Sequence, residues 1–143
     1  MSKRFIVGID SGTSVVKAVL VDLQGIELAI SIENTTVETP KEGWSEFDLY
    51  KDWDSVAKAI HRLLIENKID AEEIMAVSVT GKGWGCCYLN KNNKPVRKGI
   101  LWNDARSTPY IKEWIASGVL SEAFKISGNY YYTGDCGPIT RWV

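Results

Sequence analysis

Three short apolar runs joined by two glycine-containing turns make up residues 5–34, and they constrain the fold more than any other feature of the chain. The runs are Phe5–Asp10, Val15–Asp22 and Glu27–Asn34, and the turns between them contain Gly12 and Gly25. Runs of this length, with turns this short, are typical of neighbouring antiparallel strands. We therefore expect the chain to begin with a three-stranded antiparallel meander.

A long helix is expected after Asp48, a residue type that favours the N-cap position. Apolar side chains then recur at intervals of three and four, which predicts one buried stripe: Leu49, Trp53, Val56, Ile60, Leu63 and Leu64. Lys58 and Arg62 lie on the opposite face, which we expect to be solvated, and His61 falls at the edge of the stripe.

The rest of the chain mixes short strands and helices. The near-continuous apolar run Ile74–Thr80 is typical of a strand that is covered on both faces. The remaining expected elements are extended segments at Cys86–Leu89 and Ile100–Trp102, helices from Thr108 to Gly118 and over Ser121–Ser127, and a helix that begins within Ile139–Val143. This order predicts an α/β fold.

Composition excludes several classes of protein. The 143 residues include 17 Lys+Arg and 18 Asp+Glu, so the net charge is −1, and 45% are hydrophobic. A nearly neutral net charge argues against nucleic-acid binding carried by bulk charge, and no apolar run approaches the roughly 20 residues of a membrane span. Three cysteines and one histidine lack the spacing of a zinc site. We expect a reduced, cytoplasmic domain that binds neither nucleic acid nor a membrane.

The first turn holds the residues best suited to chemistry. Asp10 ends the first strand, where a carboxylate can hold Mg²⁺ directly or through its waters. Gly12 allows the backbone to approach a phosphate closely, and the Thr13 and Ser14 hydroxyls can add hydrogen bonds. Lys17 in the next strand adds positive charge. A plain hairpin turn uses the same residue types, so turn chemistry alone leaves both interpretations open.

Four segments, in the right order, resemble the FGGY carbohydrate kinases of the actin/Hsp70/sugar-kinase superfamily. They are Gly8–Ser14 with Lys17 and Asp22, Gly43–Glu46 with Trp53, Thr80–Gly85, and Ile100–Arg106. The stretch from Ile126 to Trp142 also fits, so the resemblance spans essentially the whole chain. It implies an RNase-H-like α/β fold in which mixed strands and helices follow the meander. Because FGGY kinases are much longer, residues 1–143 are expected to form the N-terminal part of domain I, without its remainder or domain II.

The resemblance also implies cofactors and roles. ATP and Mg²⁺ are the implied cofactors, with Asp10 organising the metal and four residues on the γ-phosphate side: Gly12, Thr13, Ser14 and Lys17. The residues implied to face the sugar are Lys82, Gly83, Trp84, Trp102 and Asp104. The catalytic-base aspartate is expected beyond residue 143, so the chain alone should be inactive. The complete enzyme is expected to be a homo-oligomer, a dimer.

Structural roles remain open for several of these residues. Without the resemblance, core packing is the simpler interpretation of Trp84 and Trp102. Asp104 is also suited to cap the following helix, or to pair with Arg106 two residues on.

The implied activity is transfer of the ATP γ-phosphoryl group to a hydroxyl of a ketose or polyol. Lys82-Gly83-Trp84 stands where the family's xylulose kinases usually have Gln-Met-His, which favours L-xylulose, rhamnulose or an erythritol-like polyol over D-xylulose. The Arg-Glu pair of glycerol kinases is also missing, at Gly83-Trp84. Two other classes remain: an ATPase switch of the Hsp70 or actin type, which turns over ATP without a sugar, and a non-catalytic sugar-binding module.

Overall fold

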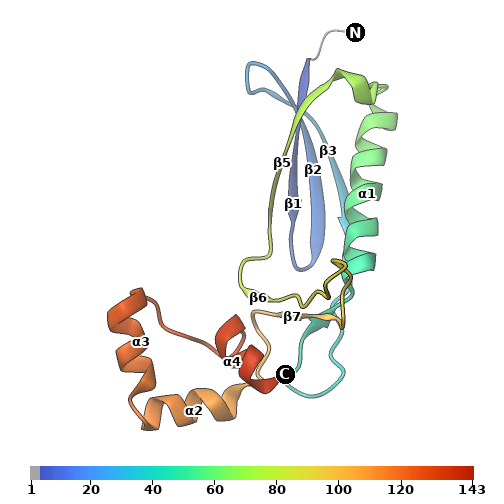
Figure 1. The fold of residues 1–143 in the computed structure, drawn as a ribbon. Coiled ribbons are helices and arrows are strands. Elements are labelled where there is room, and N and C mark those ends of the chain that lie inside the picture. The colour runs from blue at the N-terminus through green and yellow to red at the C-terminus, as the bar shows by residue number, and fades with distance from the viewer. Residues whose placement is uncertain (1–3) are drawn as a thin grey trace. The chain divides into compact units, whose positions relative to one another are not determined.

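The computed structural model describes residues 4–143, which divide into two compact units (Figure 1). The first contains residues 4–36 and Leu49–Lys82, and the second contains Val37–Asp48 and Gly83–Val143. Among the described residues, no helix has the length and apolar content needed to cross a membrane.

The first unit is a four-stranded sheet with one long helix. Its strands are β1 (Phe5–Ser11), β2 (Val15–Asp22), β3 (Glu27–Asn34) and β5 (Ile74–Gly81), in the order β3-β2-β1-β5. The first three form the expected antiparallel meander, and β5 pairs parallel to β1. A parallel neighbour needs a crossover connection, which the helix α1 (Leu49–Glu66) and the short 3₁₀ helix η1 (Ala71–Glu73) supply.

The core of this unit lies between the sheet and α1. Its buried side chains come from β1, β2 and the helix: Val7, Ile9, Val16, Ala18, Leu20, Ala59 and Leu63. Alternate residues of the two strands face this core because successive side chains of a strand point to opposite faces. Removing each valine, leucine or isoleucine side chain of this core from water contributes roughly 1.5–3 kcal/mol.

Two expectations about burial are wrong. Trp53 is 68% exposed and lies outside the buried stripe of α1, whereas Ala59 and Leu63 form the buried part. The strand β5 exists, but it is an edge strand, and Val77 and Val79 are 56% and 67% exposed. The helix packs mainly over β2 and β3, so it does not cover β5.

The second unit has a small sheet and three helices. The strands β4 (Glu46–Phe47), β6 (Gly85–Cys86) and β7 (Gly99–Leu101) form an antiparallel sheet in the order β4-β7-β6. The helices are α2 (Thr108–Ala116), α3 (Val119–Ser127) and α4 (Cys136–Trp142). Ile100 and Ile139 are fully buried and join the sheet to α4.

Most elements of this unit are close to their expected positions. The helix α2 begins at Thr108 as expected, and Gly118 follows its end in the left-handed conformation that glycine adopts most readily. The helix α3 begins two residues before Ser121, and α4 begins at Cys136 rather than within Ile139–Val143. Of the extended segment expected at Cys86–Leu89, only Cys86 lies in a strand, at the end of β6, and β4 was not expected at all.

Candidate functional site

The turn between β1 and β2 is tight and fixed at several points. The Gly12 N–H donates a 2.9 Å hydrogen bond to the Val15 carbonyl, which closes the turn. A Cβ at Gly12 would lie 2.8 Å from that carbonyl oxygen, so only glycine fits. The Thr35 hydroxyl donates to the Thr13 carbonyl at 2.6 Å, and the Thr35 N–H donates to the Ser14 carbonyl at 3.0 Å. Gly12 therefore shapes the turn, while Thr13 and Ser14 carry the hydroxyls.

Asp10 and Lys17 flank this turn on the same face of the sheet. They are direct partners across the antiparallel pair of β1 and β2, and both are exposed. Thr80 of β5 is the partner of Asp10 on its other side. This register places Lys17 next to Asp10 and the turn, and its role on the phosphate side stays a prediction.

The donor set at Asp10 fits a magnesium ion bound mainly through water and phosphate. No group of three or more His, Cys, Asp or Glu side chains in residues 4–143 is arranged to hold a metal. Mg²⁺ usually keeps several waters and uses one or two carboxylates together with substrate phosphates. An exposed aspartate at a strand end, beside a hydroxyl-bearing turn, suits that mode of binding.

A second polar cluster joins three elements at the carboxyl ends of β1 and β5. Lys82 Nζ lies 2.6 Å from Asp52 Oδ1 and donates to Ser11 Oγ at 3.1 Å. The Ser11 hydroxyl in turn donates to Asp52 Oδ2 at 3.2 Å. The Lys82 N–H also donates to the Ser11 carbonyl at 3.0 Å, and a Cβ at Gly81 would lie only 3.1 Å from that oxygen. Because Gly81 has no side chain, the backbone at Lys82 can approach β1 closely enough to form this hydrogen bond.

Ser11 and Asp52 were not singled out from the sequence. The available signal was the helical position of Asp52, three residues after Leu49 and four before Val56. A carboxylate at that spacing faces the same side of the helix as the apolar stripe and needs a polar partner there.

The five residues expected to face the sugar are divided between the units. Lys82 belongs to the first unit, and the other four belong to the second: Gly83, Trp84, Trp102 and Asp104. Trp84 and Trp102 are 67% and 53% exposed, so core packing does not account for either side chain.

Trp84 lies beside a hollow in the second unit. Its ring stacks on Tyr132 with centroids 6.2 Å apart and an interplanar angle of 23°. The hollow has a volume of about 280 Å³ and combines aromatic rings with amide, carboxylate and hydroxyl groups; among its lining residues are Trp84, Asn129, Tyr130, Tyr131 and Asp135. Aromatic faces beside a few polar groups are the usual lining of a small-molecule site.

Asp104 is fully buried and holds an arginine. Its carboxylate accepts hydrogen bonds from Arg106 Nε and Nη2, both at 2.8 Å, and from the Ser45 N–H at 2.6 Å. Burial alone would raise the pKa of Asp104, but the hydrogen bonds from Arg106 and Ser45 outweigh it and hold the pKa below its ordinary value. The residue that precedes α2 as its N-cap is Ser107, so the helix-cap interpretation of Asp104 is wrong and the pairing with Arg106 is confirmed.

Arg106 is the centre of a second set of contacts. Its guanidinium lies 3.9 Å from the ring centroid of Trp44 and 4.9 Å from that of Trp142, and it pairs with Glu46 at 2.8 Å. Burial would lower the pKa of Arg106, but Asp104 and Glu46 raise it. The Trp-Ser-Glu and Trp-Asn-Asp-Ala-Arg segments, distant in sequence, are thus joined by one buried cation.

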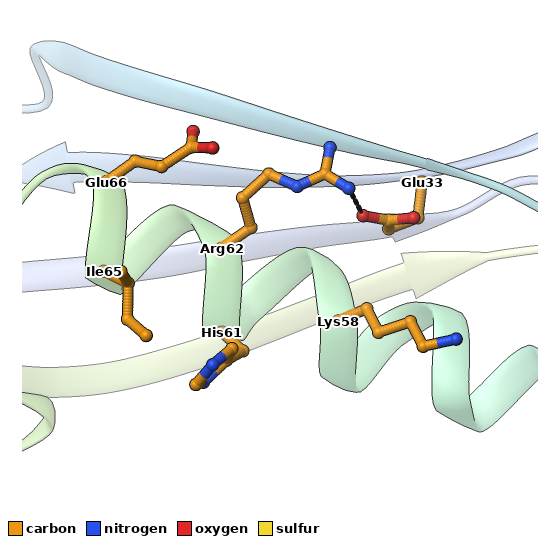
Figure 2. A pocket seen from close by; sticks show the side chains of 6 residues that line it. All are labelled: Glu33, Lys58, His61, Arg62, Ile65 and Glu66. Atoms are coloured by element: carbon orange, nitrogen blue, oxygen red, sulfur yellow. Dashed lines mark hydrogen bonds and ion pairs between the residues drawn. The ribbon is translucent and has the colours of Figure 1, made fainter.

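Another surface hollow, lined by α1 and β3, lies on the solvated face of the helix (Figure 2). Two of its charged residues, Arg62 and Glu33, form an ion pair. His61, expected at the edge of the stripe, is exposed and lines this hollow. None of the residues singled out for phosphate or sugar lies here.

Comparisons with known proteins agree on one family. Residues 5–143 match the family model described as FGGY family of carbohydrate kinases, N-terminal domain. The chain is 27% identical over 140 residues to the L-xylulose/3-keto-L-gulonate kinase of Escherichia coli, covering 98% of this chain and 28% of that protein. It is 33% identical over 124 residues to the erythritol kinase of Brucella abortus, covering 86% of this chain and 24% of that protein.

Solved structures show the same relationship. A xylulose kinase from Brucella ovis superimposes with a TM-score of 0.89 at 29% identity, over 97% of this chain and 29% of that one. A xylulose kinase from Rhodospirillum rubrum gives a TM-score of 0.84 at 27% identity, over 97% and 28%. These neighbours confirm the expected RNase-H-like fold of the actin/Hsp70 type. The chain spans less than a third of the length of these relatives, and it belongs to the FGGY family of carbohydrate kinases, whose N-terminal domain it matches.

Proposed function

We propose that the protein carrying this chain is an ATP-dependent carbohydrate kinase that phosphorylates a hydroxyl of an uncharged ketose or polyol. The observation that carries the proposal is the closed Gly12–Val15 turn, with Asp10 and Lys17 as cross-strand neighbours beside it, in a chain that matches the FGGY N-terminal domain. Phosphoryl transfer depends mainly on positioning and on stabilising charge, which is what such a corner can supply.

The phosphate side of the site is assigned to the first unit. Thr13 and Ser14 donate hydroxyl hydrogen bonds to phosphate oxygens, and Lys17 balances part of their charge. Asp10 would hold Mg²⁺, directly or through its waters, and the metal would neutralise part of the charge of the triphosphate. Gly12 contributes by shape, because its own N–H is used within the turn.

The acceptor side is assigned to Lys82, Gly83, Trp84, Trp102 and Asp104. The exposed indole of Trp84 beside Asn129 and Asp135 suits a polyol, whose C–H face packs on aromatic rings while its hydroxyls bond to polar groups. The role we assign to Asp104 is indirect, since Arg106 and Ser45 occupy its carboxylate. The base that accepts the hydroxyl proton is supplied from outside residues 1–143.

Among acceptors, we favour L-xylulose and small polyols such as erythritol. This choice rests on the Lys82-Gly83-Trp84 loop and on the likeness to an erythritol kinase. One relative that is similar over nearly the whole chain is named an L-xylulose/3-keto-L-gulonate kinase, so a sugar acid is the competing acceptor. We further propose that the complete protein is a cytoplasmic homodimer.

The test is release of ADP across a panel of ketoses and polyols, with the full-length gene product and with the 143-residue chain. We expect acceptor-dependent release by the full-length protein alone. Release that is independent of every acceptor would instead indicate an ATPase switch, and binding of a polyol without any ATP turnover would indicate a binding module.

A further inference from the structure

The Ser11–Asp52–Lys82 cluster neutralises the lysine that the proposed function places at the acceptor. The Lys82 side chain is only 9% exposed and that of Asp52 only 19%, so water screens this pair much less than it screens a surface ion pair. The 2.6 Å contact pairs one positive charge with one negative charge, and the hydroxyl of Ser11 bonds to both partners.

This arrangement also orders a flexible side chain. A lysine has a four-carbon stem with several rotatable bonds, and an unpaired ammonium samples many positions. Here the ammonium is held from two elements, by Ser11 at the end of β1 and by Asp52 in α1, and the Lys82 backbone is bonded to β1 as well. The donor is therefore fixed in place before any ligand binds.

We propose that Asp52 is a positioning and specificity residue, which holds Lys82 as a fixed, charge-neutralised hydrogen-bond donor and so selects uncharged acceptors over sugar acids. The inference rests on the proposed function. A carboxylate-bearing acceptor gains most from a lysine whose charge is uncompensated, and Asp52 removes that gain by pairing with Lys82. A hydroxyl needs only a well-placed donor.

The first experiment compares acceptors in the full-length protein. We expect Asp52→Asn to raise KM for L-xylulose or erythritol and to shift the ratio of kcat/KM for an aldonate over that for a polyol by about tenfold, the worth of one charge-assisted hydrogen bond. Asp52→Glu should restore much of the wild-type ratio. Asp54→Asn, two residues on in α1 and exposed, is the matched control and should leave the ratio unchanged.

A double-mutant cycle separates this role from a general structural one. In a Lys82→Met background, Asp52→Asn should no longer change the acceptor ratio, because the charge that Asp52 compensates is gone. A shift that persists without Lys82, or an equal shift from Asp54→Asn, would overturn the proposal.

A second readout does not depend on activity. Acetylation of lysine amines, followed by peptide mass spectrometry, should label Lys82 more slowly than the exposed Lys58 of α1, and Asp52→Asn should accelerate labelling of Lys82 alone by about tenfold. Unchanged labelling would refute the positioning role even in an active kinase. If the wild-type protein phosphorylates no acceptor but Lys82 is protected through Asp52, the proposed function fails while the positioning role stands.

Discussion

At the scale of single residues, close contacts explain why particular side chains are required. Gly8 and Gly12 show the contrast, since both lie in or beside β1 and both belong to the same motif. A Cβ at Gly8 would meet nothing within 4 Å, whereas one at Gly12 would lie 2.8 Å from the Val15 oxygen. The requirement at Gly12 comes from the turn itself, whether or not a phosphate is bound.

Gly12→Ala should therefore lower the free energy of unfolding by about 1–3 kcal/mol, because the turn must open to admit the methyl group. Gly8→Ala is the matched control, and its free energy of unfolding should stay close to that of the wild type. Urea denaturation followed by fluorescence measures both. Equal effects of the two substitutions would contradict the steric explanation.

The buried pair of Asp104 and Arg106 also belongs to this scale. Because the pKa of Asp104 is lowered in the folded chain, its ionised form stabilises the fold fully above about pH 4, the ordinary pKa of aspartate. This stabilisation is lost as the pH falls through the lower folded-state pKa.

Asp104→Asn should lower the free energy of unfolding at pH 7 by about 3–5 kcal/mol, because Arg106 would remain buried without its full charge partner. The difference from the wild type should shrink below pH 4. Denaturant titrations at several pH values test both statements, with the exposed Asp54→Asn as control. A difference that does not change with pH would show that the charge of Asp104 is unimportant.

At the scale of elements, the helix α1 shows that an apolar pattern can predict a helix correctly while including a residue that is not buried. The expected stripe included both Trp53 and Leu63. The structure buries Leu63 and exposes Trp53, and it places Asp52 on the side that faces β1. Adjacent positions such as Asp52 and Trp53 point in directions about 100° apart around a helix. The direction of a position, and not the hydrophobicity of its side chain, therefore decides which of the two faces the core.

Leu63→Ala should thus lower the free energy of unfolding by about 2–5 kcal/mol, through lost burial and the cavity that remains. Trp53→Ala removes a larger side chain but should change the free energy by less than about 0.5 kcal/mol, because the ring is exposed. Thermal and urea unfolding of the two variants provide the measurement. If Trp53→Ala is as destabilising as Leu63→Ala, Trp53 is buried as the apolar spacing predicted.

At the scale of the whole molecule, the described chain leaves apolar surface uncovered. Val77 and Val79 of the edge strand β5 are more than half exposed, although their partners in β1, Val7 and Ile9, are buried. Exposed apolar side chains on an edge strand favour association with other chains.

We expect the 143-residue chain to associate as its concentration rises, and the double substitution Val77→Lys and Val79→Lys to reduce that association. Ser78→Lys, on the opposite face of β5, is the control and should have little effect. Sedimentation velocity or light scattering over a range of concentrations measures the difference. A wild-type chain that stays monomeric throughout would contradict this prediction.

The sequence by itself determined the meander, the helix after Asp48, the helices from Thr108 to Ser127 and the family, because local period, turn residues and motif order depend on neighbours in the chain. Only the tertiary structure decided that Ser45 joins Arg106 at Asp104, that Trp53 and β5 are exposed, and that Ser11, Asp52 and Lys82 meet. Those properties depend on which distant segments pack together. Burial, and the charge pairs that join distant segments, are set by such long-range contacts, which a local pattern does not encode.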